Sequence, residues 1–192
     1  NTQAEDLKDK TLEEFYQFIG PIAQQEYSRS GLFPSVTLAQ FKLEGAFPLS
    51  RLALSNNNIF GIKCHGYHSC SSGWSTQENY GSGLVNVTDS FRKYTSVEEG
   101  IADRTNFLQE NPRYEEAGVF SATTNKEQVQ ALKKAGYATD SSYVSKLMSI
   151  IQEYNLDKWD VKINTTSSSN ICSPIGISGW PLRTIKPTPS DQ

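Results

Sequence analysis

Residues 35–48 read Ser-Val-Thr-Leu-Ala-Gln-Phe-Lys-Leu-Glu-Gly-Ala-Phe-Pro, and this stretch decides the fold. Ser35 is a preferred N-cap residue, and apolar side chains then recur at helical spacing as far as Leu43. The closing glycine and proline force the chain to change direction. We therefore predict a helix from Ser35 that ends near Gly45 and carries the carboxyl group of Glu44 at its end.

A helical pattern also precedes this stretch. Thr11 and Glu14 have the spacing of a capping box, which predicts that a helix begins there. Pro21 has no backbone N–H group, so we expect it to bend or interrupt that helix after Gly20. The segment 28–31 is expected to form a turn.

More helices are predicted downstream. A short helix that contains Leu52 and Ala53 should end at three consecutive asparagines, whose side chains compete for nearby backbone groups. Capping and stop signals predict three later helices, which run from Ser96 to before Pro112, from Thr124 to Gly136, and from Asp140 to about Tyr154.

The region between residues 59 and 94 has a different character, because Gly, Ser, Asn and aromatic residues replace the helical periodicity. Residues 84–87 and 91–94 match the pattern of short strands. The predicted fold class is therefore mainly α (α+β), with a small β-rich lobe inserted between helical halves.

Composition narrows the class of protein. The chain has 192 residues and fits one globular domain with a tail. Its net charge of -3 argues against a broad nucleic-acid-binding face. No apolar run approaches the about 20 residues that span a membrane. Because the chain starts at Asn1 without a signal peptide, we expect a processed form or an excised piece.

One short loop concentrates the cysteine and histidine residues. Cys64 and Cys70 enclose both histidines of the chain, His65 and His68, whereas Cys172 lies far downstream. A disulfide between the first two cysteines and a pair of free thiols are both compatible with this spacing. A structural zinc site is less favoured, because no second ligand pair follows at finger-like spacing.

Glu44 has the chemistry of a general acid. It ends an apolar helix and precedes an aromatic residue, so its carboxyl group can be partly desolvated, which raises its pKa toward the value that a general acid needs. Composition alone favours the simpler interpretation of a solvated glutamate near a helix terminus. We expect a catalytic Glu44 to lie partly buried on the floor of a groove.

Short motifs recur in a fixed order along the chain: Ala39–Glu44, Ser50–Ala53, Asn57–Lys63, Thr76–Glu78, Phe91–Ser96, Pro112–Tyr114 and Ala135–Asp140, followed by Tyr143. This ordered set closely resembles glycoside hydrolase family 73, the bacterial N-acetylglucosaminidases of autolysins and flagellar muralytic proteins. The resemblance covers roughly residues 13–160, most of the chain.

The resemblance implies a lysozyme-like fold whose small β-hairpin lobe flanks a substrate groove. It implies an endo-acting cut of the β-1,4 bond after N-acetylglucosamine in peptidoglycan, without metal or cofactor. Glu44 occupies the position of the acid. Glu78 matches a glutamate of the β lobe that serves as base or charge stabiliser, and Tyr137 matches a tyrosine at the cleavage site. For Glu78 a solvated loop charge, and for Tyr137 ordinary core packing, remain the alternatives.

Other aromatic and amide side chains are candidates for sugar contacts. Asn58 and Phe60 match a family motif and could shape sugar subsites, or they could belong to a structural turn. Phe47 keeps an aromatic wall where the family commonly has Ser-Gly-Trp-Gly, although Pro48 stiffens the backbone there. Trp74 and Tyr114 are candidate stacking surfaces.

The organisation that follows is a catalytic domain over residues 1–162 and a tail over 163–192. The tail is rich in Ser, Thr, Pro and Gly and reads as a linker, but it also resembles the opening of lysostaphin-like endopeptidase domains. The expected setting is extracellular, in the cell wall or on a phage tail, as a monomer or part of a larger chain. The partners are glycan strands, with no nucleic acid and no membrane.

Two other functions remain open. A muramidase or a lytic transglycosylase on the same fold can also use one helix-borne glutamate. A glycan-binding module that recognises cell walls without cutting them is the alternative of another class, and the altered turn at 45–48 motivates it.

Overall fold

The computed structural model describes residues 1–44, 47–79 and 83–163. Its helices and strands follow one another in this order: η1 (Ala4–Leu7), α1 (Leu12–Ser30), α2 (Pro34–Glu44), α3 (Arg51–Asn56), β1 (Cys70–Asn79), β2 (Leu84–Arg92), α4 (Val97–Glu110), α5 (Pro112–Glu116), α6 (Asn125–Lys134), α7 (Tyr143–Glu153) and η2 (Leu156–Trp159). The described part is thus mainly helical, with one two-stranded antiparallel sheet.

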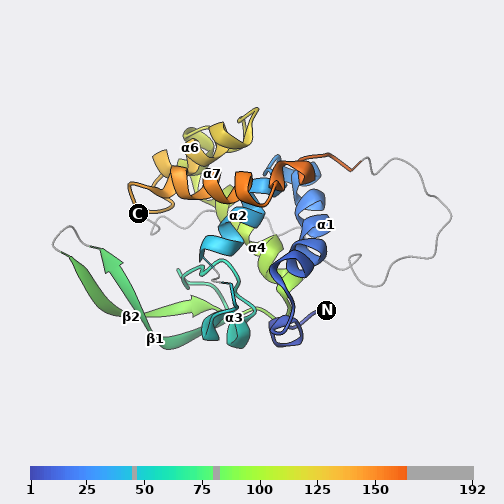
Figure 1. The fold of residues 1–192 in the computed structure, drawn as a ribbon. Helices are drawn as coiled ribbons and strands as arrows, with labels where there is room; N and C mark the ends of the chain where they lie inside the picture. Colours follow the sequence, from blue (N-terminus) through green and yellow to red (C-terminus); the bar gives the residue numbers. More distant parts are fainter. Residues whose placement is uncertain (45–46, 80–82, 164–192) are drawn as a thin grey trace.

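Helix α2 is the centre of the fold (Figure 1). It contacts α1, α6, α7 and η2, and every residue from Pro34 to Phe41 is buried. A helix that is covered on all sides has no polar face, and the few polar side chains that α2 carries must therefore find partners inside the protein. The last residue of this central helix is Glu44.

The N-terminus of α2 differs by one residue from the prediction. The helix begins at Pro34, so Ser35 lies inside it and is not its N-cap. The backbone N–H and the hydroxyl of Ser35 donate to the two carboxylate oxygens of Asp160, at 2.8 and 2.6 Å. A carboxylate from the end of the described chain therefore satisfies the free donor that a cap would have satisfied.

Helix α1 runs without interruption through Pro21, so of the predicted bend or interruption after Gly20, the interruption is wrong. The lost N–H bond is outweighed by the buried face of the helix, which includes Phe15 and Ile19. The helix also continues through most of the expected turn and ends at Ser30, where Gly31 takes a left-handed conformation with φ 84°. The predicted capping box at Thr11 is confirmed.

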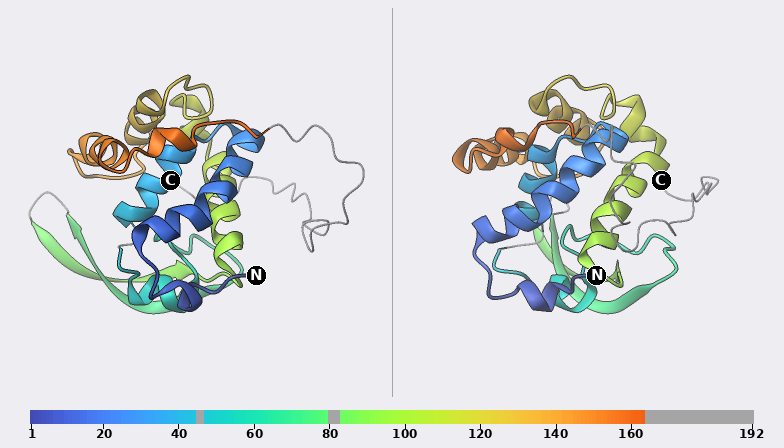
Figure 2. Two further views of the ribbon diagram at one scale, coloured as in Figure 1. Left: turned by 45° about the vertical axis from the view of Figure 1, so that its right-hand side comes forward. Right: turned by 90° about the vertical axis from the view of Figure 1, so that its right-hand side faces the viewer.

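The β lobe is a single long hairpin. Strand β2 is continuous from Leu84 to Arg92, so the two separate short strands predicted at 84–87 and 91–94 are wrong. Its partner is β1, with Cys70 opposite Arg92 and Glu78 opposite Val85. Figure 2 shows α6 and α7 on one side of the body and the hairpin, α3 and η1 on the opposite side.

Most other helix predictions are confirmed at their caps. The side chains of Ser96 and Thr124 accept hydrogen bonds from the backbone three residues further on, in α4 and α6, as predicted. Ser50, for which no cap was predicted, caps α3 in the same way. The start of α7 differs, because the helix begins at Tyr143, three residues after Asp140. Asp140 instead accepts a hydrogen bond from the backbone of Ser142, at 2.8 Å, within the preceding turn.

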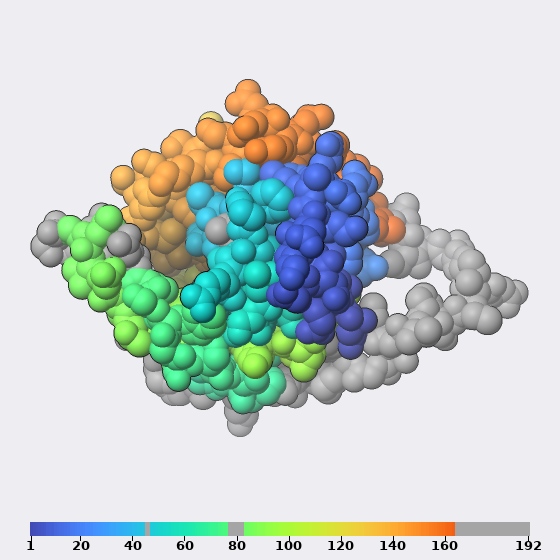
Figure 3. Space-filling view, turned by 60° about the horizontal axis from the view of Figure 1, so that its bottom comes forward, coloured from blue at the N-terminus to red at the C-terminus, as the bar shows by residue number. Residues whose placement is uncertain are grey.

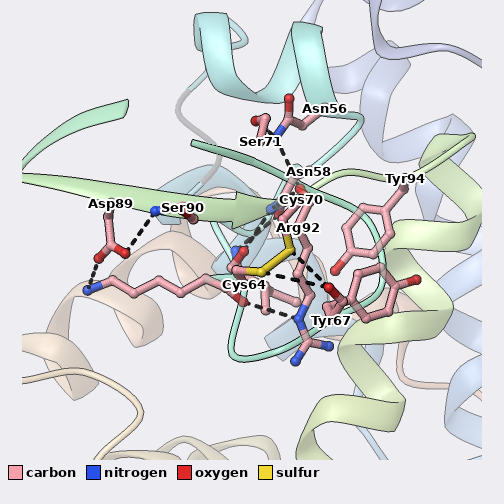
Figure 4. The surroundings of a disulfide bond; sticks show 12 residues. Asn56, Asn58, Cys64, Tyr67, Cys70, Ser71, Asp89, Ser90, Arg92 and Tyr94 are labelled. Atoms are coloured by element: carbon pink, nitrogen blue, oxygen red, sulfur yellow. Dashed lines mark hydrogen bonds and ion pairs between the residues drawn. A yellow bond between two sulfur atoms is a disulfide. The ribbon is translucent and has the colours of Figure 1, made fainter. Parts of the chain in front are cut away.

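The Cys64–Cys70 disulfide forms, with the two Cα atoms 5.8 Å apart (Figure 4). Next to it, the guanidinium group of Arg92 donates to a carboxylate oxygen of Asp103 at 2.9 Å and lies 4.8 Å from the ring centre of Tyr67. These contacts attach the base of the hairpin to α4. Because both cysteines are used in the disulfide, the zinc alternative is wrong for this loop.

Among the described residues, no helix is long and apolar enough to cross a membrane. The linker, the endopeptidase-like motif and Cys172 all lie outside the described residues, so these remain predictions.

Candidate active site

Glu44 lies where α2 leaves the core. The elements that contact α2 bring the segment between α6 and α7, together with the start of α7, beside this helix. Burial raises the pKa of the hydroxyl groups of two tyrosines from that region, Tyr137 and Tyr143, and the negative charge of the nearby Glu44 raises both further. We call these three side chains the helical wall.

The carboxyl group of Glu44 is tuned toward neutrality. Its pKa is raised from an ordinary value of 4.5 to about 7, mainly because surrounding protein removes water from the charged form. The side chain is nevertheless exposed to solvent, more than the partial burial that we expected. A carboxyl group that meets water on one side and protein on its other sides has both properties. A carboxyl group with such a pKa can hold a proton near pH 7 and release it in a reaction.

Tyr143 opposes this shift. Its hydroxyl group lies close enough to the carboxyl group of Glu44 to favour the charged form, which lowers the pKa of Glu44. The same hydroxyl accepts a hydrogen bond from the side-chain amide of Gln40, at 2.8 Å. Tyr143 and Gln40 are both buried, the first at the start of α7 and the second one turn before the end of α2. The geometry holds the tyrosine oxygen beside the acid.

Tyr137 is half-buried and lies between two other tyrosine rings. Its ring centre is 6.2 Å from that of Tyr114 and 6.0 Å from that of Tyr143. Burial, followed by the charge of Glu44, raises the pKa of its hydroxyl above the ordinary range. Tyr137 therefore meets Glu44 as a neutral hydrogen-bonding group at neutral pH.

Asp140 is the other charge that acts on Glu44. Its negative charge contributes to the raised pKa of Glu44, after desolvation. Asp140 forms an ion pair with Lys146 on α7, at 2.5 Å, and this contact lowers its own pKa. The two carboxyl groups therefore have separated pKa values, as expected where one is to carry a proton and the other a charge.

The surface is hollowed next to this wall. Figure 3 shows a depression between the hairpin in green, the segment that follows α2 in cyan and the segment that includes α7 in orange. The hairpin thus forms the opposite side of the depression, and we call β1 and β2 together the hairpin wall. A groove with a helical wall and a hairpin wall is the geometry that the sequence predicts.

Glu78 belongs to the hairpin wall. Its backbone lies near the end of β1, opposite Val85, on the hairpin that borders the depression. Trp74, on the same strand, is half-buried, and its indole N–H donates to Ser71 at 2.7 Å. Part of the Trp74 ring system therefore faces outward on the hairpin.

Asn58 and Phe60 lie inside the protein. Asn58 is 1% exposed, and its amide donates to the backbone oxygens of Ile62 and Arg92 and accepts from the backbone of Ile62. Phe60 is 2% exposed. Neither side chain offers a surface to a sugar, and their contacts are those of the structural turn that was the alternative prediction.

Tyr114 and Phe47 also pack against protein. Tyr114 is 1% exposed, and its hydroxyl accepts a hydrogen bond from Arg113 at 3.1 Å. It therefore supports the ring of Tyr137 from behind and has no free face for stacking. Phe47 is half-buried and meets the edge of Phe15, with ring centres 5.7 Å apart. Phe47 keeps some outward surface close to the end of α2.

Comparisons with known proteins show the family to which this chain belongs. Residues 20–156 match the family described as Glucosaminidase, mannosyl-glycoprotein endo-beta-N-acetylglucosaminidase. The chain belongs to this family. It is a family of glycoside hydrolases, as the sequence motifs predict, and the lysozyme-like fold with a small antiparallel sheet is confirmed.

Relatives of this glucosaminidase domain include the exo-glucosaminidase LytG of Bacillus subtilis, 32% identical over 72% of this chain and 50% of that protein. The peptidoglycan hydrolase FlgJ of Escherichia coli strain K12 is 34% identical over 78% of this chain and 48% of that protein. Among solved structures, the catalytic domain of the autolysin Auto from Listeria monocytogenes has a TM-score of 0.67 at 32% identity, over 78% of this chain and 87% of that one. The chain thus spans about half the length of these two full-length relatives.

Three residues of this candidate site were not predicted as site residues. Tyr143 and Gln40 occur in the motifs that carry the resemblance, but nothing in their spacing shows that they meet. Asp140 was expected to be a helix cap. The signal that could have found Gln40 is its place in an otherwise apolar helix, because a buried amide requires partners.

Metal binding finds no support in the described ranges. Within them no group of three or more His, Cys, Asp and Glu side chains could hold a metal ion. The arrangement around Glu44 is suited instead to proton transfer by a carboxyl group between two neutral tyrosines.

Proposed function

We propose that this chain hydrolyses the glycan strands of peptidoglycan at the β-1,4 bond that follows N-acetylglucosamine, with Glu44 as general acid. The observation that carries the proposal is the carboxyl group of Glu44, whose pKa is raised to about 7 beside Tyr137 and Tyr143. Family membership and the names of the relatives, glucosaminidase and peptidoglycan hydrolase, support the substrate class.

The first step is a proton transfer. The protonated Glu44 gives its proton to the glycosidic oxygen as the bond to the sugar carbon breaks, and positive charge develops on the ring. The carboxylate left behind accepts the hydrogen bond of Tyr143, which stabilises the product of the transfer. The hydroxyl group of Tyr137 is available on the same side to orient the acetamido group of the sugar.

The nucleophile that completes the reaction comes from one of two sources. Glu78 on the hairpin wall can activate a water molecule, which requires the two carboxyl groups to stand about 6.5–9.5 Å apart in the closed complex. Alternatively, the acetamido group of the substrate attacks its own anomeric carbon, and one protein carboxyl group suffices. The position of Glu78 on the hairpin that borders the depression supports the first route.

Product analysis tests the bond. Purified peptidoglycan is digested, and the new reducing ends are identified by borohydride reduction and mass spectrometry. Reducing N-acetylglucosamine is the expected result. Reducing N-acetylmuramic acid would identify a muramidase, and an anhydro sugar would identify a lytic transglycosylase. Short products from the start of the digest would indicate an exo-acting enzyme, whereas a broad range of lengths is expected for an endo-acting one.

A binding module is the alternative from another class. The substitution Glu44→Gln removes the proton donor and nearly preserves the shape. If wild type and variant sediment equally with cell walls and neither releases sugar, the chain binds glycan without cutting it. We expect both to bind, and only the wild type to release sugar.

We further propose that the chain acts outside the cytoplasm, at a cell wall or on a phage tail, as one domain of a longer protein. The domain covers residues 1–162 and the tail is a linker or the start of an endopeptidase domain. Limited proteolysis tests the boundary, because it should leave a fragment that ends near residue 163 and keeps full activity on peptidoglycan.

A further inference from the structure

Arg104 is a buried cation in the middle of α4. Its side chain is 0% exposed, and in the described part of the chain no carboxylate forms an ion pair with it. Its Nη1 donates to the hydroxyl of Thr37 at 3.0 Å, its Nη2 has no partner among the described residues, and its guanidinium carbon lies 5.2 Å from the ring centre of Phe60. Burying a charge without a counter-ion is costly, so its position calls for a function.

The remaining contact of Arg104 leads toward Glu44. Its Nε donates to the side-chain oxygen of Gln40 at 2.8 Å. A guanidinium group has only donors, so the oxygen of the Gln40 amide must face Arg104 and the nitrogen must face the other way. That nitrogen donates to the hydroxyl oxygen of Tyr143 at 2.8 Å. The direction of each hydrogen bond is thus fixed by the one before it.

Tyr143 ends the chain of hydrogen bonds at the acid. Since its oxygen accepts from Gln40, its own proton points away from Gln40, and the acceptor close to it is the carboxyl group of Glu44, whose pKa this hydroxyl lowers. A protonated carboxyl group has one oxygen that accepts and one that carries the proton. When Tyr143 occupies the accepting oxygen, the proton of Glu44 sits on the other oxygen.

We propose that Arg104 is a positioning residue of the glycosidase site: through Gln40 it fixes the direction in which Tyr143 donates, and so fixes which oxygen of Glu44 carries the transferable proton. This inference rests on the proposed function, because it assigns a purpose to the acid named there. Arg104 does not touch the reacting atoms and acts only through Gln40 and Tyr143.

The charged and titratable groups around this chain of bonds are few. From the α6–α7 segment, Tyr137 and Asp140 face Glu44, while Tyr137 also faces Arg104 and Tyr143. From α1, the charge of Glu26 acts on Arg104, although Glu26 itself pairs with Arg29 at 2.6 Å. None of these groups supplies Gln40 with a second donor or acceptor in the described structure.

The substitution Gln40→Glu reverses the direction of the hydrogen bond between residue 40 and Tyr143 and nearly preserves the shape of the side chain. A carboxylate at position 40 only accepts, so it takes hydrogen bonds from both Arg104 and Tyr143, and the tyrosine proton leaves Glu44. We expect a folded protein with an unchanged or higher thermal midpoint, because Arg104 gains a counter-ion. We also expect kcat to fall about tenfold and the loss of activity at high pH to move up by about one pH unit. If Arg104 were merely structural, Gln40→Glu would act on Glu44 only through its added charge, and its effect would be the same with and without the hydroxyl of Tyr143.

The variant Tyr143→Phe distinguishes the effect of the reversed hydrogen bond on Glu44 from the effect of the added charge. Without the hydroxyl, Gln40→Glu acts on Glu44 only through space, so its effect on kcat should disappear and its pH shift should shrink. Equal effects in the two backgrounds would overturn the proposal. The matched control is Gln109→Glu at an exposed position near the end of α4, which should change neither kcat nor the profile.

Direct titration keeps this test independent of activity. The side-chain carboxyl carbons of glutamate are labelled, and the resonance of Glu44 is assigned by its loss in Glu44→Gln. Gln40→Glu and Tyr143→Phe should each raise the pKa of Glu44. An unchanged pKa in both variants would refute the positioning role, whereas a wild type that cuts no peptidoglycan would refute the proposed function and leave this titration readable.

Discussion

The two walls of the groove are held in different ways. The helical wall grows out of the core: Glu44 ends the central helix, and Tyr143 is 1% exposed and bonded to Gln40. The hairpin wall is anchored at its base by the disulfide and by Arg92, while Leu84 and Val85 near its tip are 70% and 45% exposed. The difference indicates that the chemistry is built into the rigid wall, and that the hairpin adds a substrate-facing surface that few core contacts constrain.

The largest effect is expected from the helical wall. Glu44→Gln should lower kcat on peptidoglycan by about a thousandfold, because a general acid is removed while the shape is kept. The release of reducing sugar over time measures this loss. A decrease of less than tenfold would show that another group supplies the proton.

The thermal stability of Glu44→Gln is the control for this experiment. The pKa of Glu44 determines how the difference in stability between wild type and variant changes with pH. Glu44 has its pKa raised to about 7 in the folded protein, so the stability that its protonation contributes is present at low pH and is lost as the pH rises through about 7. Glutamine stays neutral at every pH. Glu44→Gln should therefore melt at a higher temperature than wild type above pH 7 and at the same temperature near pH 4.

A smaller effect is expected from the acidic residue of the hairpin wall. Glu78→Gln should lower kcat by about a hundredfold if it activates the water molecule. Sodium azide, a small nucleophile, should then restore part of the rate by attacking in place of the water. Full activity in Glu78→Gln would assign the second role to the acetamido group of the substrate.

A substitution at the base of the hairpin wall should lower the stability and leave the pH profile of the activity unchanged. Asp103→Asn leaves the buried guanidinium of Arg92 without its carboxylate, at a cost of about 2 kcal/mol. Urea unfolding measures this cost. The pH profile of the remaining activity should match the wild type, in contrast to Gln40→Glu, which changes the α2 partner of the neighbouring Arg104.

The smallest effect is expected at the tip of the hairpin. Leu84→Ser changes an exposed side chain, so the free energy of unfolding should change by less than about 0.5 kcal/mol. A large loss in the same urea experiment would show that the tip packs against the body in solution, and the contrast between the two walls would then be wrong.

Local sequence patterns correctly predicted the helix caps, which depend on residues close together in the chain. The caps at Thr11, Ser96 and Thr124 are confirmed because their partners lie three residues away. Where packing between distant segments decides, the prediction was wrong: the buried face of α1 carries Pro21 through the helix, and the hairpin joins two predicted short strands into β2.

The same distinction holds for the site. Glu44 was predicted from its place at the end of a helix and from the ordered motifs. Its partners could not be derived in this way, since Arg104, Gln40 and Tyr143 lie up to 103 positions apart in the bonds that join them. An arginine on the apolar stripe of α4 and a glutamine in the central helix are traces of this connection in the sequence, but their meaning depends on which side chains the fold brings to them.

The most direct test of the central claim is to compare the titration of Glu44 with the pH profile of kcat/KM on peptidoglycan. The account predicts one glutamate carboxyl group that titrates near pH 7 and is absent in Glu44→Gln, together with activity that is present below pH 7 and is lost as the pH rises through the same value. If the Glu44 resonance titrates near pH 4.5 while activity persists at pH 7, Glu44 is not the general acid.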